Sequence, residues 1–404
     1  MSGALDGFRV LDLSRILAGP WASQMLADLG AEVIKVERPQ QGDDTRAWVP
    51  PYMPGAKGDA TTESAYFHGA NRGKRSISID MSTEQGQSII RKLAMVSDVL
   101  IENFKVGGLK KYGLDYASLK RINPKLVYCS ITGFGQTGPY AQRAGYDFMI
   151  QAMGGLMSVT GTPEGEPMKV GVALVDVMTG LYAANAIQAA LIHQLKTGDG
   201  QYIDLALLDV QVATLANQAM NFLASGNNPQ RLGNAHPNIV PYQAFQTNDG
   251  FIILAIGNDA QFSRFCELTP AQTLATDERY QKNASRVKNR GSLIPLIVDI
   301  MQSQNTDWWL DHLNQRGIPC GPINNLDQVF SDPQVQFRNM QLELDHPTAG
   351  KVASVKNPIN LSETPLEYDR CAPTLGQHTD EVLSQILGLD QTKIESLREQ
   401  KIVS

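Results

Sequence analysis

The chain is poor in cysteine, and its uninterrupted apolar runs are short. Its four cysteines, Cys129, Cys266, Cys320 and Cys371, are scattered and form no CxxC pair. This usage argues against a disulfide scaffold and predicts reduced thiols in a cytoplasmic protein. The first residues, MSGALDGFRVLDLSR, lack a charged and then apolar leader, and no apolar run reaches the roughly 18 residues of a membrane span. We therefore expect no membrane partner.

The chain also lacks a net positive charge and the common catalytic motifs. The formal net charge is −6, so nucleic acid is not expected as a partner. There is no GxSxG, no HExxH and no clustered metal-ligand spacing, so no metal site is predicted. The six histidines are far apart, and a hydrolase triad has little support. Any anionic ligand must be held by a local group of basic residues.

What the sequence does contain is a regular alternation of strand and helix patterns. Apolar strand-like runs lie at 8–13, 31–37, 98–103 and 125–132, and helical patterns fall between them. This alternation predicts an α/β fold with a doubly wound parallel sheet. The first strand-to-helix turn reads LAGP rather than the GxGxxG of dinucleotide folds. GFGQTG at 133–138 matches that motif but lacks its context, and is interpreted as a glycine-rich turn close to a ligand.

A chain of 404 residues is long enough for two or more domains. A hairpin pattern at 242–257 and the polar helical region after it predict a second, smaller α+β domain. We divide the chain into a large domain at 1–200, a linker at 201–232, a small domain at 233–325, a linker at 326–374, and a return to the large domain at 375–404.

Asp176 lies where an apolar run gives way to a helical pattern that ends at Lys196 and Gly198. One interpretation is an ordinary N-cap aspartate. The other is a nucleophilic carboxylate that attacks an activated acyl group, with backbone N–H groups of glycine-rich turns holding the oxyanion. Basic residues at element ends could line a phosphate-rich ligand in the crevice at the strand ends. They are Lys35, Arg38, Arg72, Lys74, Arg75, Lys105, Lys110 and Lys111.

Several segments then add up to a resemblance. In chain order they are LAGPWASQMLADLGAEVIKVERP, GDDTR, NRGKRSISID, ENFKVGGLKKYGL, SITGFGQTGPY, GYDFMIQAMGG and VDVMTG. The chain resembles the class III CoA-transferases, the family of formyl-CoA transferase and carnitine CoA-transferase, from residue 7 to nearly the C-terminus. The resemblance implies a Rossmann-like large domain, a small domain, and a homodimer of interlocked rings, which the connections at 201–241 and 326–375 would permit.

The resemblance also implies the site residues. Asp176 matches the nucleophile that becomes an aspartyl anhydride and then an aspartyl-CoA thioester. CoA, or acyl-CoA, is implied as a substrate, with no tightly bound cofactor. The positions matching CoA contacts are Leu17, Ala18, Arg38, Ile79, Asp80, Met81, Ser82, Asn103, Phe104, Lys105, Lys111, Tyr146 and Asp147. Ser82 replaces a family lysine and Lys111 a family arginine. The lid-like segment IGNDAQ at 256–261 is less glycine-rich than in formyl-CoA transferase.

Three functions remain to be distinguished. GNAHPNIVPYQAF, CGPINN and LGQHT resemble the succinyl-CoA:glutarate branch, which implies transfer of CoA from succinyl-CoA to a dicarboxylic acid such as glutarate or oxalate. An acyl-CoA racemase of the same fold would have histidine where this chain has Tyr146, and a tyrosine is a poor base at neutral pH. A non-catalytic nucleotide-binding module would need the basic residues and be indifferent to Asp176.

Overall fold

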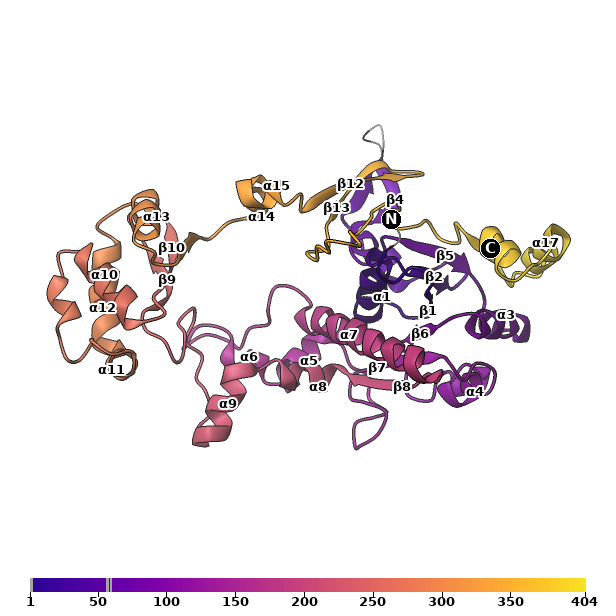
Figure 1. Ribbon diagram of the computed structural model, residues 1–404, viewed down its shortest axis with the longest axis horizontal. Helices are drawn as coiled ribbons and strands as arrows, with labels where there is room; N and C mark the ends of the chain where they lie inside the picture. Colours follow the sequence, from indigo (N-terminus) through magenta and orange to yellow (C-terminus); the bar gives the residue numbers. More distant parts are fainter. Residues whose placement is uncertain (1–2, 56–57, 59) are drawn as a thin grey trace. The chain divides into compact units, whose positions relative to one another are not determined.

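The computed structural model describes residues 3–55, 58 and 60–404 (Figure 1). The chain folds as two compact units, each described here by itself. Unit 1 comprises Met1–Leu156, Val170–Ala219 and Gln336–Ser404, and unit 2 comprises Met157–Lys169 and Met220–Val335. Unit 1 is therefore assembled from segments on both sides of unit 2 in the sequence.

Unit 1 is built on a six-stranded sheet with the strand order β5-β2-β1-β6-β7-β8. All five neighbouring pairs are parallel. The strands are β1 (Arg9–Asp12), β2 (Glu32–Glu37), β5 (Lys74–Ser78), β6 (Val99–Glu102), β7 (Val127–Thr132) and β8 (Tyr202–Ala206). The large parallel sheet expected from the sequence is confirmed. The order reverses direction between β1 and β6, which makes this pair the topological switch point of the sheet.

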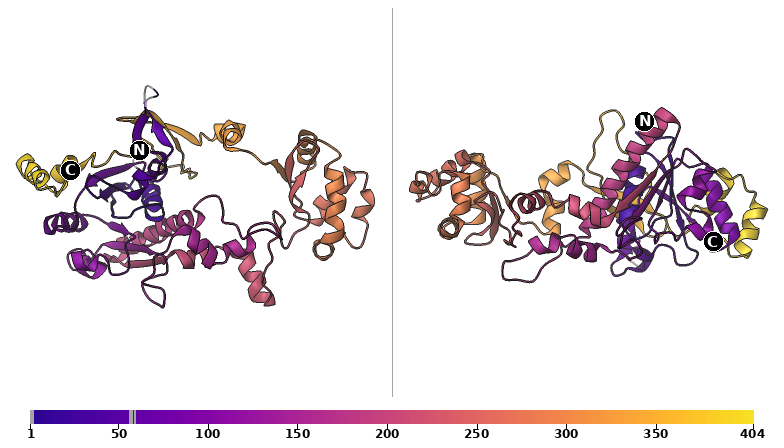
Figure 2. Two further views of the ribbon diagram at one scale, coloured as in Figure 1. Left: turned by 180° about the vertical axis from the view of Figure 1, so that it is seen from behind. Right: turned by 90° about the horizontal axis from the view of Figure 1, so that it is seen from below.

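Helices cover both faces of this sheet, which is why its central strands are continuous apolar runs (Figures 1 and 2). On one face, Val10 and Ile101 pack with α1 (Ala18–Asp28) and α7 (Leu174–Thr197). On the other, Leu11 and Leu100 pack with helices from distant parts of the chain. These are α3 (Glu84–Met95), α4 (Tyr116–Lys120), α16 (Thr379–Gln385) and α17 (Gln391–Glu399).

Shorter elements complete unit 1. Two of them are antiparallel hairpins, one of which pairs residues around 52–64 and the other residues 341–355. The elements are η1 (Asp44–Ala47), β3 (Tyr52–Pro54), β4 (Ala60–Ser64), α2 (Ala65–His68), η2 (Lys110–Tyr112), α5 (Asp147–Met153), α8 (Leu207–Ala213), β12 (Gln341–His346) and β13 (Gly350–Val355). Helices α6 (Leu156–Val159) and α9 (Ala216–Ser225) cross the boundaries between the units.

Unit 2 has its own apolar core beneath a three-stranded antiparallel sheet of order β11-β10-β9. Phe245, Phe262 and Trp309 are among its buried side chains. Its elements are β9 (Tyr242–Gln246), β10 (Phe251–Ala255), α10 (Asp259–Glu267), η3 (Gln272–Ala275), α11 (Asn283–Lys288), α12 (Arg290–Met301), α13 (Thr306–Gln315), β11 (Cys320–Pro322), α14 (Leu326–Ser331) and α15 (Pro333–Phe337), the last of which extends past the boundary.

Both segments predicted as linkers contain regular structure. Residues 201–232 begin with β8, whose Ser130-to-Asp204 register with β7 makes it the outer strand of the large sheet. Residues 326–374 include the β12–β13 hairpin, where Leu344 and Val352 are buried in a small apolar cluster of their own. Polar and apolar residues alternate in this hairpin, so its sequence is less apolar than that of a central strand.

Helix α7 alone among the described helices is long and apolar enough, by length and composition, to cross a membrane. A core helix of an α/β domain passes the same test, and α7 is such a helix because Ala183, Ile187 and Ala190 are buried in unit 1. Its composition is explained by this packing.

Gly180 lets α1 approach α7 very closely. A Cβ added at Gly180 would lie 2.9 Å from the carbonyl oxygen of Ala18 and 2.9 Å from the Cβ of Trp21. Gly180 is one helical turn after Asp176, so both are on the same side of α7. The glycine therefore brings the N-terminus of α1 against the face of α7 that carries Asp176.

This packing predicts opposite outcomes for two glycine-to-alanine changes in helices. Gly180→Ala should lower the free energy of unfolding by about 1–3 kcal/mol, because α1 must move away from the added methyl group. Gly291→Ala in α12 meets open space, so it should raise the free energy of unfolding by up to about 1 kcal/mol through helix propensity. Urea unfolding of both variants measures this, and equal stabilisation by both would contradict the close contact.

Candidate active site

The loops that follow β1 and β6 meet at the switch point of the sheet, where ligands of open α/β folds bind. The side chain of Asn103, just after β6, fixes the loop after β1 in two ways. Its Oδ1 accepts the N–H of Arg15 at 2.9 Å, and its Nδ2 donates to the carbonyl of Arg15 at 2.7 Å. The two loops therefore form one wall.

A cavity of about 170 Å³ opens beside this wall, and Asp176 lines it. Leu17 and Ala18 contribute from the start of α1, and Asn103, Phe104 and Lys105 from the loop after β6. Gly133, Gly145 and Tyr146 line the side formed by the loop after β7. The cavity thus collects residues from four separate segments of the sequence around one carboxylate.

Asp176 is not the N-cap of α7, so the first of the two interpretations is wrong. The helix begins at Leu174, with Ala173 as its N-cap. The capping acceptor is instead Asp147 of α5, whose Oδ1 accepts the N–H of Val175 at 2.7 Å and that of Asp176 at 3.3 Å. Because Asp147 satisfies these N–H groups, the carboxylate of Asp176 is left to face the cavity. No hydrogen bond to that carboxylate occurs among the described residues.

The surroundings of Asp176 favour its neutral form. Burial raises the pKa of the Asp176 carboxyl to about 7, and the negative charge of Asp147 adds to the shift. A carboxylate that ionises near neutral pH is a stronger nucleophile than one with an ordinary pKa near 4, and still forms readily at pH 7. Such a shift is typical of functional carboxylates.

A second cavity, of about 410 Å³, adjoins the first through shared lining residues. Arg15, Phe104 and Lys105 line both. Five further residues predicted to contact CoA line only the second cavity, namely Arg38, Asp80, Met81, Ser82 and Lys111. The Arg38 guanidinium pairs with Asp44 at 3.1 Å, and the Lys111 ammonium lies 4.6 Å from the ring centre of Tyr112. The two cavities offer an elongated ligand a continuous path with basic residues along it.

Two predicted ligand residues lie outside the cavity linings. Ile79 is buried in the core, and its backbone N–H bonds to the carbonyl of Glu37 at 2.9 Å. Asp147 accepts hydrogen bonds from the first N–H groups of α7, as described above. It therefore lies next to Asp176 without lining either cavity. The other predicted positions lie on one or the other cavity.

Four of the basic residues expected at a phosphate site, Lys110 among them, do not line these cavities. Arg72 forms a buried pair with Asp28 at 2.7 Å, and Arg75 pairs with Glu32 and Glu381. Lys74 is fully buried beside Asp12 at 3.2 Å. The sequence could not show this, because the acidic partners come from other segments.

Sequence reasoning missed several lining residues, among them Arg15, Ile16 and Arg143. Arg143 stands out because its guanidinium lies over the rings of Phe134 and Tyr140, at 5.3 and 4.5 Å from their centres. The aromatic residues and the glycines of 133–145 were the available signal. Gly133 and Gly145 touch so closely that a Cβ on Gly133 would lie 2.6 Å from Gly145 Cα, which brings this loop back to the cavity.

One group of possible metal ligands occurs in the part of the chain that the structure describes, formed by Glu63, His68 and His346. The Nδ1 atom of His346 accepts the backbone N–H of Ala349 at 3.0 Å. Its neutral ring therefore carries its proton on Nε2, the atom that faces Glu63. The Arg46 guanidinium, 3.7 Å from Glu63, also opposes a bound cation. The group fits a polar contact between segments better than a metal centre.

The raised pKa of Asp176 predicts a measurable gain in stability for Asp176→Asn. The unfolded state loses this proton near pH 4 and the native state near pH 7, so the free energy of unfolding falls as pH rises between these values. The amide cannot ionise and escapes this loss. Asp176→Asn should therefore exceed the wild type by up to about 4 kcal/mol at pH 8 and match it below pH 4. Urea unfolding at both pH values tests this; an N-cap role would instead give a loss of about 1 kcal/mol.

Comparison with known proteins agrees with this geometry. Residues 5–379 match the family described as CoA-transferase family III. The chain is 53% identical over 388 residues to the succinate–glutarate CoA-transferase of Agrobacterium fabrum, covering 96% of this chain and 97% of that one. It is 44% identical to the human succinyl-CoA:glutarate CoA-transferase, covering 97% and 88%. A crystal structure of a CAIB/BAIF family protein from Brucella suis superposes with a TM-score of 0.84 at 51% identity, covering 96% and 100%. The resemblance seen in the sequence is confirmed, and the chain belongs to CoA-transferase family III.

Proposed function

We propose that this enzyme moves CoA from succinyl-CoA to glutarate, with Asp176 as the nucleophile. The observation that carries the mechanism is the Asp176 carboxylate, which lines a cavity at the switch point without a hydrogen-bond donor among the described residues. The full-length similarity to two proteins named for succinate and glutarate supports the choice of substrates. A nucleotide-binding module would have no use for such a carboxylate.

The first half-reaction begins with ionised Asp176. One of its carboxylate oxygens attacks the thioester carbon of succinyl-CoA, the carbon–sulfur bond breaks, and CoA leaves as a thiolate. The product is a mixed anhydride of Asp176 and succinate, which keeps the acyl group activated. The thiolate then attacks Cγ of Asp176, succinate departs, and an aspartyl-CoA thioester remains.

The second half-reaction reverses these steps with glutarate. A glutarate carboxylate oxygen attacks Cγ of Asp176, and the thiolate leaves again to give the second anhydride. The thiolate then attacks the glutaryl carbonyl carbon, which releases glutaryl-CoA and regenerates the carboxylate of Asp176. Water takes no part in these steps, so the free energy of the thioester bond is conserved as CoA passes from succinate to glutarate.

The second cavity suits the nucleotide end of CoA. Phosphates need cations, and Arg38, Lys105 and Lys111 line this cavity or its junction with the first. Leu17, Ala18 and Tyr146 then lie at the thioester end, beside Asp176. In this arrangement Asp80, Met81 and Ser82 bound the adenosine side, with Ser82 donating its N–H and hydroxyl to Asp80.

A dicarboxylic substrate has a second carboxylate that must also be bound. Arg143 lines the Asp176 cavity and is held by aromatic rings rather than by an acidic residue. Its planar guanidinium can take a carboxylate in a bidentate contact. Arg143 is therefore the residue we assign to the distal carboxylate of succinyl and glutaryl groups.

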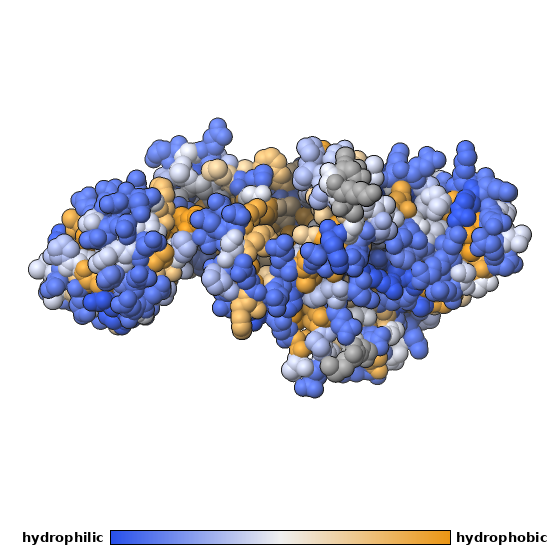
Figure 3. Space-filling view, turned by 90° about the horizontal axis from the view of Figure 1, so that it is seen from above, coloured by the Kyte–Doolittle hydropathy of each residue, from blue (hydrophilic) through white to orange (hydrophobic). Residues whose placement is uncertain are grey.

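We further propose that the protein is a cytoplasmic homodimer. Helix α7 exposes Leu181, Ile192 and Leu195, which are eleven and three residues apart and therefore lie on one side of the helix. Phe148 of the neighbouring α5 is also exposed. Figure 3 shows apolar side chains exposed among hydrophilic ones on one face of the molecule. Exposed apolar stripes of this kind are typical of contacts between subunits.

The path of the chain supports an interlocked arrangement. After unit 2, the chain returns and docks on the early part of unit 1, where Gly73 donates to the carbonyl of Arg370 and His378 to that of Ser76. Ile79 also forms a bridge with Val403. Each chain is thereby closed into a loop by non-covalent contacts, and a second chain can thread such a loop.

Replacement of Asp176 tests the chemistry. Asp176→Ala should abolish CoA transfer while leaving CoA affinity within a few-fold, because the basic residues of the second cavity are untouched. Hydroxylamine added with succinyl-CoA should modify the wild type at Asp176, as mass spectrometry of the peptide would show. Asp199→Ala, in the exposed turn after α7, is the matched control and should retain both transfer and modification. Substantial transfer by Asp176→Ala would overturn the mechanism.

The interlocked dimer predicts unusual resistance to dilution. Sedimentation velocity from micromolar to nanomolar concentration should show one dimeric species throughout, because separation requires a chain to open its loop. Dissociation should coincide with unfolding in urea. A folded monomer at nanomolar concentration would remove this proposal.

A further inference from the structure

The turn between β1 and α1 is held in an unfavourable backbone conformation. Ile16 has φ of 72°, a left-handed value that a β-branched residue rarely adopts. Conformations of this kind persist only where the surroundings impose them, and they concentrate at functional sites. Ile16 lines the Asp176 cavity together with Leu17 and Ala18, so the strained residue lies in the wall of the site.

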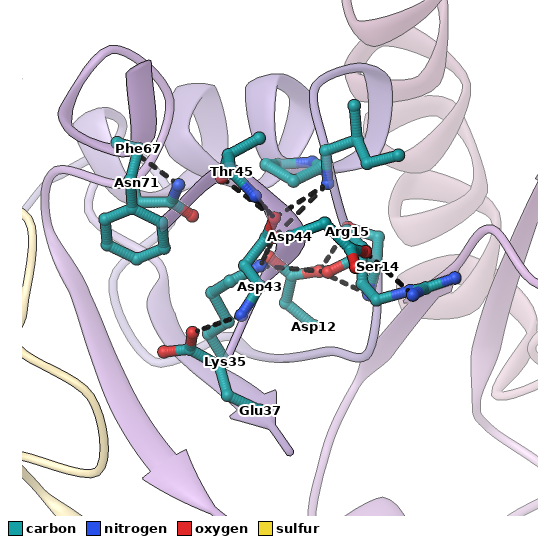
Figure 4. Close-up of polar contacts among 12 residues, drawn as sticks. Asp12, Ser14, Arg15, Lys35, Glu37, Asp43, Asp44, Thr45, Phe67 and Asn71 are labelled. Carbon is teal, nitrogen blue, oxygen red and sulfur yellow. Dashed lines mark hydrogen bonds and ion pairs between the residues drawn. The ribbon is translucent and has the colours of Figure 1, made fainter. Parts of the chain in front are cut away.

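A buried ion pair between Lys35 and Asp43 contacts this turn (Figure 4). Both carboxylate oxygens of Asp43 accept the N–H of Ile16 at 3.2 Å. The Lys35 ammonium lies 2.9 Å from Asp43 and also donates to the carbonyl of Ser14 at 2.9 Å. The pair therefore holds the turn at the carbonyl of Ser14, two residues before Ile16, and at the N–H of Ile16 itself.

Asp43 is in turn fixed by its own neighbours. Its Oδ1 accepts the N–H of Thr45 at 3.0 Å and the Thr45 hydroxyl at 2.8 Å. The side chains of Lys35 and Asp43 are both fully buried. The Lys35 ammonium and these hydrogen bonds hold the pKa of Asp43 down to about 2, so Asp43 is ionised at every working pH. Asp43 therefore remains a charged hydrogen-bond acceptor for the N–H of Ile16 at every working pH.

The turn determines where free backbone donors point. The N–H groups of Leu17 and Ala18 have no acceptor among the described residues, and no side chain caps α1. Gly180 places this end of α1 against the face of α7 that carries Asp176. Uncapped N–H groups at a helix start are suited to a developing negative charge.

We propose that Asp43, anchored by Lys35, is a positioning residue that holds the Ile16 turn so that the N–H groups of Leu17 and Ala18 face the oxyanion formed when Asp176 attacks. This inference rests on the proposed function. Neither Asp43 nor Lys35 touches the substrate, and they act through the backbone of the turn. A buried ion pair is seldom needed for stability alone, since apolar residues of similar size do as well.

The test compares Asp43→Ala with Asp28→Asn, which breaks another buried pair of unit 1, that with Arg72. Removal of an oxyanion donor typically lowers kcat by about 10²–10³-fold. Asp43→Ala should therefore lose at least about 10² in kcat and in the rate of hydroxylamine modification of Asp176, with KM for succinyl-CoA within about three-fold. Asp28→Asn should lose stability but keep kcat.

Combining Ile16→Gly with Asp43→Ala distinguishes the positioning role from a purely structural one, because only the positioning role predicts a recovery of kcat. Glycine adopts a φ of 72° without strain, so the double variant Asp43→Ala, Ile16→Gly should recover at least tenfold in kcat over Asp43→Ala. If Asp43→Ala does not fold, Asp43→Asn carries the same test, because the amide oxygen keeps one acceptor and should give an intermediate kcat. Circular dichroism verifies the fold of each variant.

The outcomes separate the two proposals. If the wild type forms the Asp176 adduct and Asp43→Ala forms it equally fast, the positioning role is overturned while the proposed function stands. Failure of glycine to restore kcat would also overturn it. If the wild type forms no adduct, both proposals fall.

Discussion

The capping of α7 by Asp147 is the contact on which the active site depends. A helix start needs acceptors for its first N–H groups, and the side chain of the N-cap residue is the usual supplier, which Ala173 cannot be. Here the acceptor is Asp147 of α5, so the carboxylate of Asp176, in the first turn of α7, is not needed to accept these hydrogen bonds. The same carboxylate of Asp147 adds negative charge near Asp176 and contributes to its raised pKa. Asp147 thus both leaves the proposed nucleophile free of a capping role and contributes to its raised pKa.

Much of the fold could be predicted from the sequence, since strands buried on both faces are continuous apolar runs. The family motifs also singled out Asp176, which the structure places in the wall of a cavity. The role of Asp147 could not be predicted, because it depends on α5 packing beside α7 across 28 residues of chain. The burial of Lys35 and Lys74 was also hidden, because a lysine in a strand reads as exposed unless its acidic partner is known. Local sequence patterns predict helices and strands. Which charged side chains face a ligand depends on their acidic partners, which come from distant segments of the chain.

Charge is placed differently at the two ends of the sheet. At one end, Arg72 and Arg75 are neutralised by acidic partners and bind segments of unit 1 together. At the other, Lys105 and Lys111 line the cavities without a carboxylate partner among the described residues. The protein has a net negative charge, so these few unpaired cations define where a polyanionic substrate can bind.

The return of residues 370–404 to the early part of unit 1 has a consequence for biosynthesis. Val382, Leu383 and Ile394 cover one face of the large sheet, yet they emerge from the ribosome after the whole of unit 2. Until then, Ile77 and Ile79 lack these partners. Unit 2 is almost entirely continuous in sequence and can gain its core first, whereas unit 1 depends on contacts of high sequence separation, which form slowly. Newly made chains therefore pass through a stage with an open apolar sheet face, before residues 370–404 close the loop that the proposed interlocked dimer requires.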